Sequence, residues 1–270
     1  MLNDYKINNC KILKITPEGS DSKLLTLSAP YKGFSFEPGQ YVMVSIPGFG
    51  EAAISLTSDF NAKKFIQLTI RKCGTLTSEI HNKKAGESLG IRGPYGRPFP
   101  IDLAKGKNIL IVAGGIGIEP FRPIILDAIK NPKKYKKVYI FCGSRDESTM
   151  LYAKEYPAWK KVCDLSLTLD NPKTKKYTKG QVTALFDIKN IPADAIAFMC
   201  GPPVMYKFVM AKMLAKGFKP ENIFLSLERH MDCAQGVCQH CAIGPYYVCK
   251  DGPVFSYAEL MNFKSWLSPI

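Results

Sequence analysis

The sequence predicts three parts: an antiparallel β-barrel, a doubly wound α/β domain with a parallel sheet, and a small cysteine-rich appendage. Three observations predict this fold class. Residues 1–102 contain short alternating strands punctuated by Gly and Pro, residues 103–228 alternate apolar strands with helices, and residues 229–270 hold four closely spaced cysteines. We expect the boundaries between the three parts at these positions.

The β-barrel is predicted from strands at 41–46 and 65–70, in which β-branched and aromatic residues are frequent. Pro38-Gly39, Pro47-Gly48 and Gly93-Pro94 predict turns between strands. Many short strands separated by such turns are typical of an antiparallel barrel.

The α/β domain is predicted from a change of pattern after about residue 105. Residues 108–113 form a continuous apolar run, as in a parallel strand covered on both faces. Further strands are predicted at 137–142, 164–169 and 195–200, and helices at 119–130 and 205–216. Strands that alternate with helices indicate a doubly wound sheet.

The composition is that of an ordinary globular protein of 270 residues, with 46% hydrophobic and 22% charged residues. The longest apolar stretch, 109–118, is interrupted by glycines and is too short to span a membrane. The first six residues contain no signal-peptide core, so we expect a cytoplasmic protein. The net charge of +14 is dispersed over lysines without a nucleic-acid-binding motif, and it fits either a solvated face or a dock for acidic partners.

The four clustered cysteines are spaced as Cys233-x4-Cys238-x2-Cys241-x7-Cys249. The first three match the plant-type ferredoxin spacing, which predicts a [2Fe-2S] cluster. A structural zinc site remains an alternative, although zinc sites usually contain two C-x2-C pairs and only one is present here. His230 and His240 raise the alternative of a Rieske centre, but four thiols are already available, and exposed loop histidines are the simpler interpretation.

A glycine-rich loop follows the first predicted parallel strand and contains Gly114, Gly115, Gly117 and Pro120. Glycines there let the backbone approach a pyrophosphate, which the N-terminus of the next helix would attract. The pattern departs from G-x-G-x-x-G, since Pro120 stands where the third glycine would be. The second strand also departs, because it runs into Ser144-Arg145 instead of ending in an acidic residue that binds the ribose.

Taken together, these motifs resemble the ferredoxin–NADP reductase superfamily over essentially the whole chain. Within it, the sequence is similar to electron-transfer subunits with a C-terminal [2Fe-2S] cluster. These are the gamma subunit of sulfhydrogenases, the flavin-binding subunit of anaerobic sulfite reductase and, more distantly, the electron-transfer subunit of dihydroorotate dehydrogenase. The likeness rests on residues 50–55, 74–77, 93–96, 114–120, 200–203 and the tail from 226 to 255.

The resemblance implies that FAD and NAD(P)H bind here. Ser55 matches a hydroxyl near the flavin, and Cys200 matches a cysteine near the nicotinamide; both are candidate catalytic residues. The arginine that pairs with the FAD pyrophosphate in the family is replaced by Ala52, so Arg71 and the 74–77 loop are expected to substitute. The full set of expected cofactor-binding residues is Ala53, Ile54, Ser55, Thr69, Arg71, Gly74, Thr75, Leu76, Thr77, Gly114, Gly115, Gly117, Pro120, Ser144, Arg145, Asp170, Cys200, Gly201 and Pro202.

The choice between NADH and NADPH depends on the end of the predicted strand at 164–169. Asp170 there favours NADH, since a carboxylate accepts a hydrogen bond from a free ribose hydroxyl and repels a phosphate. Arg145, Lys173, Lys175 and Lys176 favour NADPH. On balance these residues predict a slight preference for NADH.

The function predicted from these residues is an NAD(P)H-dependent flavin oxidoreductase subunit, in which FAD links a two-electron donor to a one-electron cluster. We expect its partners to be a catalytic redox subunit, of hydrogenase or sulfite reductase type, and a ferredoxin-like subunit. Alternatives are a dihydroorotate dehydrogenase electron-transfer subunit, an oxygenase reductase component, or a zinc-stabilised nucleotide-sensing protein without turnover.

Overall fold

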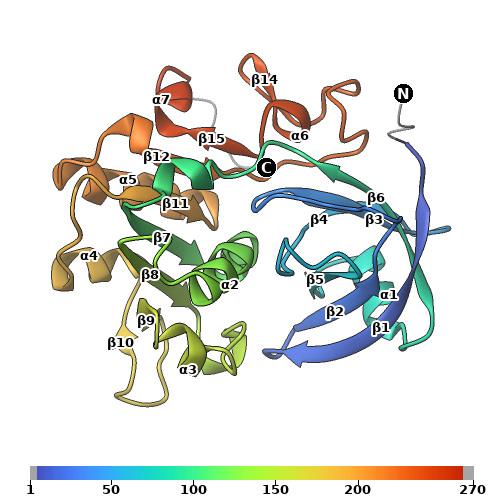
Figure 1. Ribbon diagram of the computed structural model, residues 1–270, viewed down its shortest axis with the longest axis horizontal. Helices are drawn as coiled ribbons and strands as arrows, with labels where there is room; N and C mark the ends of the chain where they lie inside the picture. Colours follow the sequence, from blue (N-terminus) through green and yellow to red (C-terminus); the bar gives the residue numbers. More distant parts are fainter. Residues whose placement is uncertain (1–4, 264–270) are drawn as a thin grey trace.

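The computed structural model describes residues 5–263. Two sheets lie side by side in it, and the C-terminal region lies above the junction between them (Figure 1). The predicted fold class of an antiparallel barrel, a parallel-rich α/β domain and a small C-terminal region is confirmed.

The first sheet has six antiparallel strands in the order β4-β3-β6-β1-β2-β5. Its elements, in chain order, are β1 (Asn8–Glu18), β2 (Ser22–Ser28), β3 (Tyr41–Ile46), β4 (Gly50–Ser55), β5 (Phe65–Arg71), helix α1 (Thr75–Asn82) and β6 (Ser88–Tyr95). A bridge between Leu56, just after β4, and Leu68 of β5 joins the two edges of the sheet, which makes it barrel-like. Apolar side chains from all six strands fill its interior.

One turn prediction in this part is wrong. Pro38-Gly39 and Pro47-Gly48 lie in turns, but Gly93-Pro94 lies inside strand β6. The pair sits where the register between β6 and β3 shifts, between Tyr41 and Met43. A bulge tolerates a residue without an N–H group inside a strand, and Gly93 supplies the positive φ of 128°.

The second sheet has seven strands in the order β10-β9-β8-β7-β11-β12-β15, all parallel except β15. The strands before the last are β7 (Asn108–Gly114), β8 (Lys137–Ser144), β9 (Cys163–Leu169), β10 (Thr178–Lys179), β11 (Ile196–Cys200) and β12 (Ile223–Ser226). The helices between them are α2 (Arg122–Lys130), α3 (Tyr156–Trp159), α4 (Leu185–Ile188) and α5 (Pro203–Ala215). Short 3-10 helices occur at η1 (Ile101–Ala104), η2 (Gly115–Phe121), η3 (Glu147–Thr149), η4 (Val182–Ala184) and η5 (Pro220–Asn222).

Helices cover both faces of this sheet because alternate residues of each strand point to opposite sides. Ile109 and Ile111 of β7 pack with α2 and α3, whereas Leu110 and Val112 pack with α4 and α5. The strand at 108–113 is therefore buried on both faces, as its continuous apolar run predicts. The predicted helix at 119–130 begins only at Arg122, since the glycine-rich residues before it form the 3-10 helix η2.

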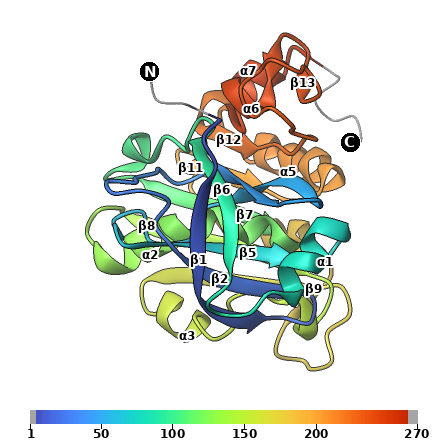
Figure 2. The ribbon, with the colours of Figure 1, turned by 90° about the vertical axis from the view of Figure 1, so that its right-hand side faces the viewer.

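The C-terminal region continues the second sheet, which the sequence did not predict. Its elements are β13 (Ala242–Ile243), β14 (Tyr246–Tyr247), α6 (Val248–Asp251), β15 (Val254–Ser256) and α7 (Tyr257–Leu260). Strand β15 pairs antiparallel with β12, so the cysteine loop before it is held at the edge of the α/β domain. Figure 2 shows α6 and α7 of this region above β12. Among residues 5–263, no helix is both long and apolar enough to cross a membrane.

Candidate functional site

A cavity of about 460 Å³ opens at the carboxyl ends of the parallel strands. Ligands of open α/β sheets bind at this edge. The cavity is lined by loops that follow β7, β8, β9 and β11. The predicted binding residues that line it are Arg71, Gly114, Gly115, Ser144, Arg145, Asp170, Gly201 and Pro202.

The glycine-rich loop at this cavity requires glycine for close packing. A Cβ atom on Gly117 would lie 2.3 Å from the carbonyl oxygen of Cys200, and one on Gly114 would lie 2.8 Å from the sulfur of Met205. Gly115 has a φ of 57° and faces open space, which leaves its backbone accessible from the cavity. The loop therefore fits a pyrophosphate of a dinucleotide, as its glycines predict. Gly117 and the buried Pro120 support the loop without lining the cavity.

A buried carboxyl group that the sequence analysis missed lies behind the cavity, close enough to the lining residues Arg71 and Glu228 to feel their charges. Glu119 is 6% exposed, and its Oε1 has no hydrogen-bond partner among the described residues. Burial raises the pKa of Glu119 well above its usual value, and the charge of Glu228 adds to the rise while Arg71 opposes it. Burial likewise raises the pKa of the Cys200 thiol, which is therefore protonated. The sequence signal that could have revealed this buried carboxyl group is the acidic residue at position 119, in the glycine-rich loop.

The outer end of the cavity brings Asp170 and Arg145 together. The Asp170 N–H donates to the Ser144 carbonyl at 3.1 Å, which joins the ends of β8 and β9. Arg145 also contacts Asp146, at 3.5 Å. The predicted phosphate-binding lysines, Lys173, Lys175 and Lys176, do not line the cavity.

The predicted flavin-binding residues lie on β4, β5 and the start of α1. Ala53, Ile54 and Ser55 are half-buried at the end of β4. Helix α1 begins at Thr75, so its first N–H groups have no acceptor within the helix and suit a pyrophosphate. A Cβ atom on Gly74 would meet nothing within 4 Å, so the backbone there is open to a ligand. These features fit the FAD that the sequence predicts.

The first turn of α1 is stabilised by Thr77. Its Oγ1 accepts hydrogen bonds from the N–H groups of Cys73 and Gly74, both at 2.9 Å. The other predicted residue on β5, Thr69, is buried, and its hydroxyl is 2.6 Å from the Tyr152 hydroxyl of the α/β domain.

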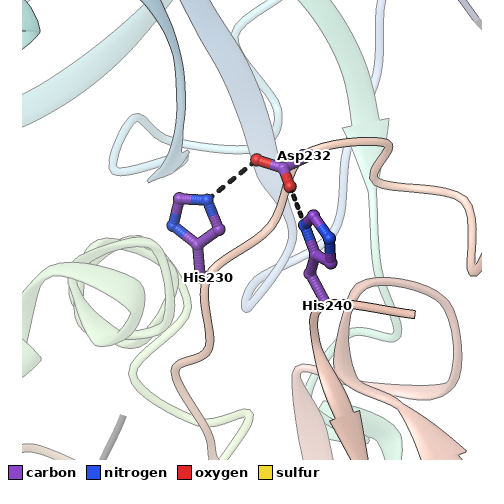
Figure 3. A group of neighbouring side chains, drawn as sticks. All are labelled: His230, Asp232 and His240. Carbon is purple, nitrogen blue, oxygen red and sulfur yellow. Dashed lines mark hydrogen bonds and ion pairs between the residues drawn. The ribbon is translucent and has the colours of Figure 1, made fainter. Parts of the chain in front are cut away.

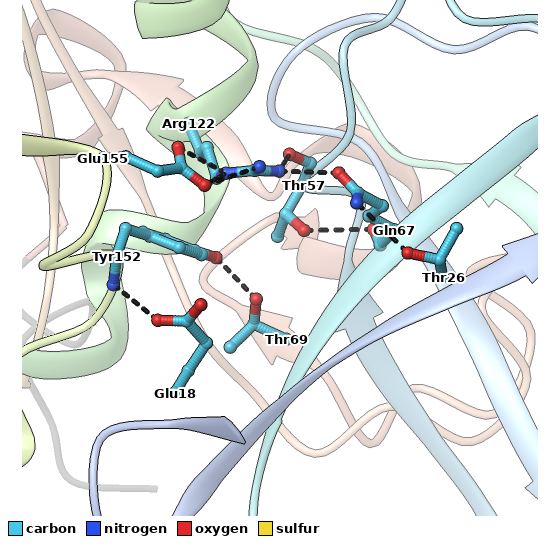
Figure 4. A network of polar contacts seen from close by, with 8 residues as sticks. All are labelled: Glu18, Thr26, Thr57, Gln67, Thr69, Arg122, Tyr152 and Glu155. Atoms are coloured by element: carbon cyan, nitrogen blue, oxygen red, sulfur yellow. Dashed lines mark hydrogen bonds and ion pairs between the residues drawn. The ribbon is translucent and has the colours of Figure 1, made fainter. Parts of the chain in front are cut away.

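That contact belongs to a polar network between the barrel and the α/β domain (Figure 4). Arg122 of α2 donates to the Thr57 carbonyl at 2.7 Å and to Gln67 Oε1 at 2.8 Å, while it pairs with Glu155 at 2.7 Å. The Tyr152 N–H donates to Glu18 at 2.9 Å. The network fixes the barrel against the α/β domain, and with it the position of the flavin-binding strands relative to the nucleotide cavity.

The cysteine loop is built to hold sulfur anions. Ala234, Gly236 and Gln239 adopt φ values of 61°, 73° and 67°, which turn successive N–H groups inward. N–H groups of Gln235, Val237 and Cys238 donate to Cys233 Sγ at 3.3 to 3.4 Å, and Gly236 N–H donates to Cys249 Sγ at 3.1 Å. Cys233 lies beside Cys238 and Cys249 lies beside Cys241. Two pairs of thiols with backbone donors around them fit a two-iron cluster.

The thiols of this loop differ in their affinity for protons. Partial burial opposes ionisation of Cys233, but the N–H donors of Cys238, Gln235 and Val237 outweigh it and lower its pKa to about 6. Burial and the neighbouring Cys241 thiol raise the pKa of Cys249 to about 12. Thiolates are the form that metals bind, and the N–H groups around Cys233 stabilise that form.

Arg92 connects the cysteine loop to the barrel, a role that no sequence signal indicated. It is 4% exposed and pairs with Glu51 through two hydrogen bonds of 2.8 and 2.6 Å. Two further donors bind the carbonyls of Asp232 at 2.7 Å and Cys233 at 2.9 Å, and another contacts the Tyr95 hydroxyl at 3.3 Å. The Tyr41 hydroxyl donates to the Cys249 carbonyl at 3.0 Å and provides a second connection.

Comparisons with known proteins agree with the three regions. Residues 9–99 match the oxidoreductase FAD-binding domain, residues 111–211 the oxidoreductase NAD-binding domain, and residues 228–261 the iron–sulfur cluster binding domain of dihydroorotate dehydrogenase B. The three predicted cofactors, FAD, NAD(P)H and an iron–sulfur cluster, are thereby confirmed, and the zinc-protein alternative is not supported.

Relatives match almost the whole chain. Sulfhydrogenase 2 subunit gamma of Pyrococcus furiosus is 37% identical over 97% of this chain and 98% of the relative. A probable dihydroorotate dehydrogenase B (NAD(+)) electron transfer subunit of the same organism is 34% identical over 84% of this chain and 82% of the relative. A solved structure of NADH-dependent reduced ferredoxin-NADP oxidoreductase has a TM-score of 0.77 at 23% identity, over 97% of this chain and 94% of that chain, and shares the fold.

Proposed function

This chain belongs to the family of FAD-, NAD- and iron–sulfur-binding electron-transfer subunits that includes those of sulfhydrogenase and dihydroorotate dehydrogenase B, and from that premise we propose how its residues divide the work. The chain moves electrons between NAD(P)H and a catalytic partner subunit, with hydrogenase as the favoured partner type. The observation that supports this partner is the similarity to a sulfhydrogenase gamma subunit over nearly the full length of both chains.

The α/β cavity binds the nicotinamide nucleotide. Gly114 and Gly115 offer backbone N–H groups to its pyrophosphate, Asp170 and Arg145 border the adenosine ribose, and Gly201 and Pro202 line the nicotinamide end. The buried Cys200 directly precedes Gly201 and supports this end from behind. Arg71 and Glu228 line the same cavity. Arg71 is placed on the barrel strand β5, so nucleotide and flavin sites share one wall.

The barrel binds FAD. Ala53, Ile54 and Ser55 on β4 face the flavin, and Arg71 with the N–H groups at Gly74 to Thr77 supports the pyrophosphate in place of the arginine lost at Ala52. FAD, when bound, accepts a two-electron hydride and releases single electrons. The protein supplies position and charge for this chemistry, and the protonated Cys200 and Glu119 add no negative charge beside it.

The cysteine loop holds a [2Fe-2S] cluster through Cys233, Cys238, Cys241 and Cys249. Arg92 and Tyr41 fix the loop against the barrel that binds FAD. We also propose that the three functional domains are residues 1–102, 103–228 and 229–270, that the protein acts in the cytoplasm, and that a ferredoxin-like subunit joins the assembly.

The experiment that tests this division uses Cys238→Ser in anaerobically purified protein. We expect wild type to contain about two irons per chain. The variant should lose the cluster, while NAD(P)H still bleaches the flavin absorption. Full iron content in the variant would remove Cys238 from the ligands, and loss of flavin reduction would contradict the division between the sites.

A dihydroorotate dehydrogenase partner is the second candidate, favoured by the match of residues 228–261 to that enzyme's cluster-binding domain. Co-purification of the natively expressed chain separates the two candidates. A hydrogenase-type subunit in the complex supports the first, whereas dihydroorotate-dependent flavin reduction supports the second.

A further inference from the structure

We propose that His230, Asp232 and His240 form a surface site for a divalent transition-metal cation, with zinc as the favoured ion, separate from the four cysteines. Figure 3 shows the Asp232 carboxylate between the two imidazole rings. His230 Nε2 lies 2.9 Å from one carboxylate oxygen, and His240 Nδ1 contacts the other. The three ligand atoms all lie within 4.8 Å of one another.

The donor set matches zinc chemistry. Zinc binds imidazole nitrogen at about 2.0–2.1 Å and carboxylate oxygen at about 2.0–2.2 Å, commonly with three protein ligands and one open position. Donor atoms within 4.8 Å of one another can reach these distances by small rotations of the side chains. All three side chains are exposed, so water can occupy the open position.

The backbone holds two of the three ligands in place. Asp232 directly precedes Cys233, and its carbonyl is bound by the buried Arg92 guanidinium at 2.7 Å. His240 directly precedes Cys241, and the left-handed Gln239 before it, with a φ of 67°, turns the chain. Ligands on a preorganised backbone bind a metal with less loss of conformational entropy.

The remaining interpretation is that Asp232 only makes ion pairs with two exposed histidines. Such exposed pairs contribute little to stability and bind no cation. The ion-pair interpretation and the proposal predict different results when a divalent cation is added: only the proposed site binds it.

The test is isothermal titration of zinc into tag-free protein that carries its full iron content, so that the cysteines are occupied. Wild type should bind one zinc ion per chain. His230→Ala and His240→Ala should each weaken binding roughly tenfold or more, since a lost ligand costs at least as much as a lost supporting hydrogen bond. His81→Gln is the matched control, because His81 is the only other histidine of the chain and binds the Ile70 carbonyl within the barrel.

Iron is measured in every variant, and only variants that keep the wild-type iron content are compared. A zinc-edge anomalous signal between the three side chains in soaked crystals provides a second measurement. Absence of zinc binding by wild type, or equal affinity in wild type and both histidine variants, would overturn the proposal. A weakening in His81→Gln equal to that in the other two would also overturn it.

Discussion

Glu119 lies in an environment that is unusual for a carboxyl group. It lies in η2 beneath the nucleotide cavity, and one of its carboxyl oxygens has no partner among the described residues. A buried charge without a partner is costly, so the carboxyl group keeps its proton instead. The chain therefore carries a neutral acid where a negative charge would oppose an approaching nucleotide.

The raised pKa of Glu119 makes the stability depend on pH. The unfolded chain releases this proton near the ordinary glutamate value of about 4.3, whereas the folded chain retains it. The contribution of Glu119 to the stability of the folded chain therefore falls as the pH rises from about 4.3 towards the higher pKa that this carboxyl group has in the folded chain. We expect the melting temperature of Glu119→Gln, relative to wild type, to increase between about pH 5 and about pH 8. A difference in melting temperature that does not change with pH would contradict this expectation.

Asp170 determines the predicted preference for NADH, because it lines the cavity with Arg145 while the lysines do not. In Asp170→Ser the ratio of kcat/KM values should shift towards NADPH. We expect roughly threefold to fivefold, since the exposed carboxylate contributes at most about 1 kcal/mol. Arg145→Ser should shift the ratio the other way. Steady-state dye reduction with each nucleotide measures both, and an unchanged ratio in Asp170→Ser would be incompatible with a ribose contact.

At the scale of elements, the sequence predicted those strands and helices whose formation depends on the local pattern of apolar and polar residues. The apolar run at 108–113 and the helix predicted at 205–216 correspond to β7 and α5, since burial on two faces and helix-forming residues are both encoded locally. The turn predicted at Gly93-Pro94 is wrong because the pair lies at a bulge, and a bulge depends on pairing with a partner strand that is distant in sequence. Strand β15 and the Arg92 contacts could not be predicted, because they join residues more than 25 positions apart through tertiary packing.

The stability of the cysteine loop is predicted to depend on Arg92. Arg92→Ala leaves Glu51 without its partner and releases the carbonyls of Asp232 and Cys233, which should cost about 3 kcal/mol of unfolding free energy. Arg92→Lys keeps the charge but loses the planar, two-pronged set of guanidinium donors. Its unfolding free energy should therefore lie between those of wild type and Arg92→Ala. Iron content and urea unfolding measure the outcome. Wild-type iron in Arg92→Ala would show that the loop needs no such connection.

At the scale of the whole molecule, function requires the barrel and the α/β domain to keep a fixed relation. The cavity is lined by Arg71 from the barrel together with the loops of the second sheet. Electron transfer depends on this arrangement, since a hydride donor must lie against its acceptor. The polar network around Arg122 and Tyr152 helps to hold this arrangement, since it joins barrel and α/β residues and Arg122, at 8% exposed, is largely shielded from water.

The last prediction concerns that interface. Arg122→Ala removes the hydrogen bonds to the Thr57 carbonyl and Gln67 and leaves Glu155 unpaired, at a cost of about 3 kcal/mol. Because the lost contacts join the two domains, calorimetry should show one transition in the wild type and a broadened or split transition in the variant. Lys130→Ala is the matched control: Lys130 also crosses the interface, to Asp59, but is 58% exposed and should contribute less than about 1 kcal/mol. A single sharp transition in Arg122→Ala, shifted no further than in Lys130→Ala, would mean that apolar packing alone couples the two domains.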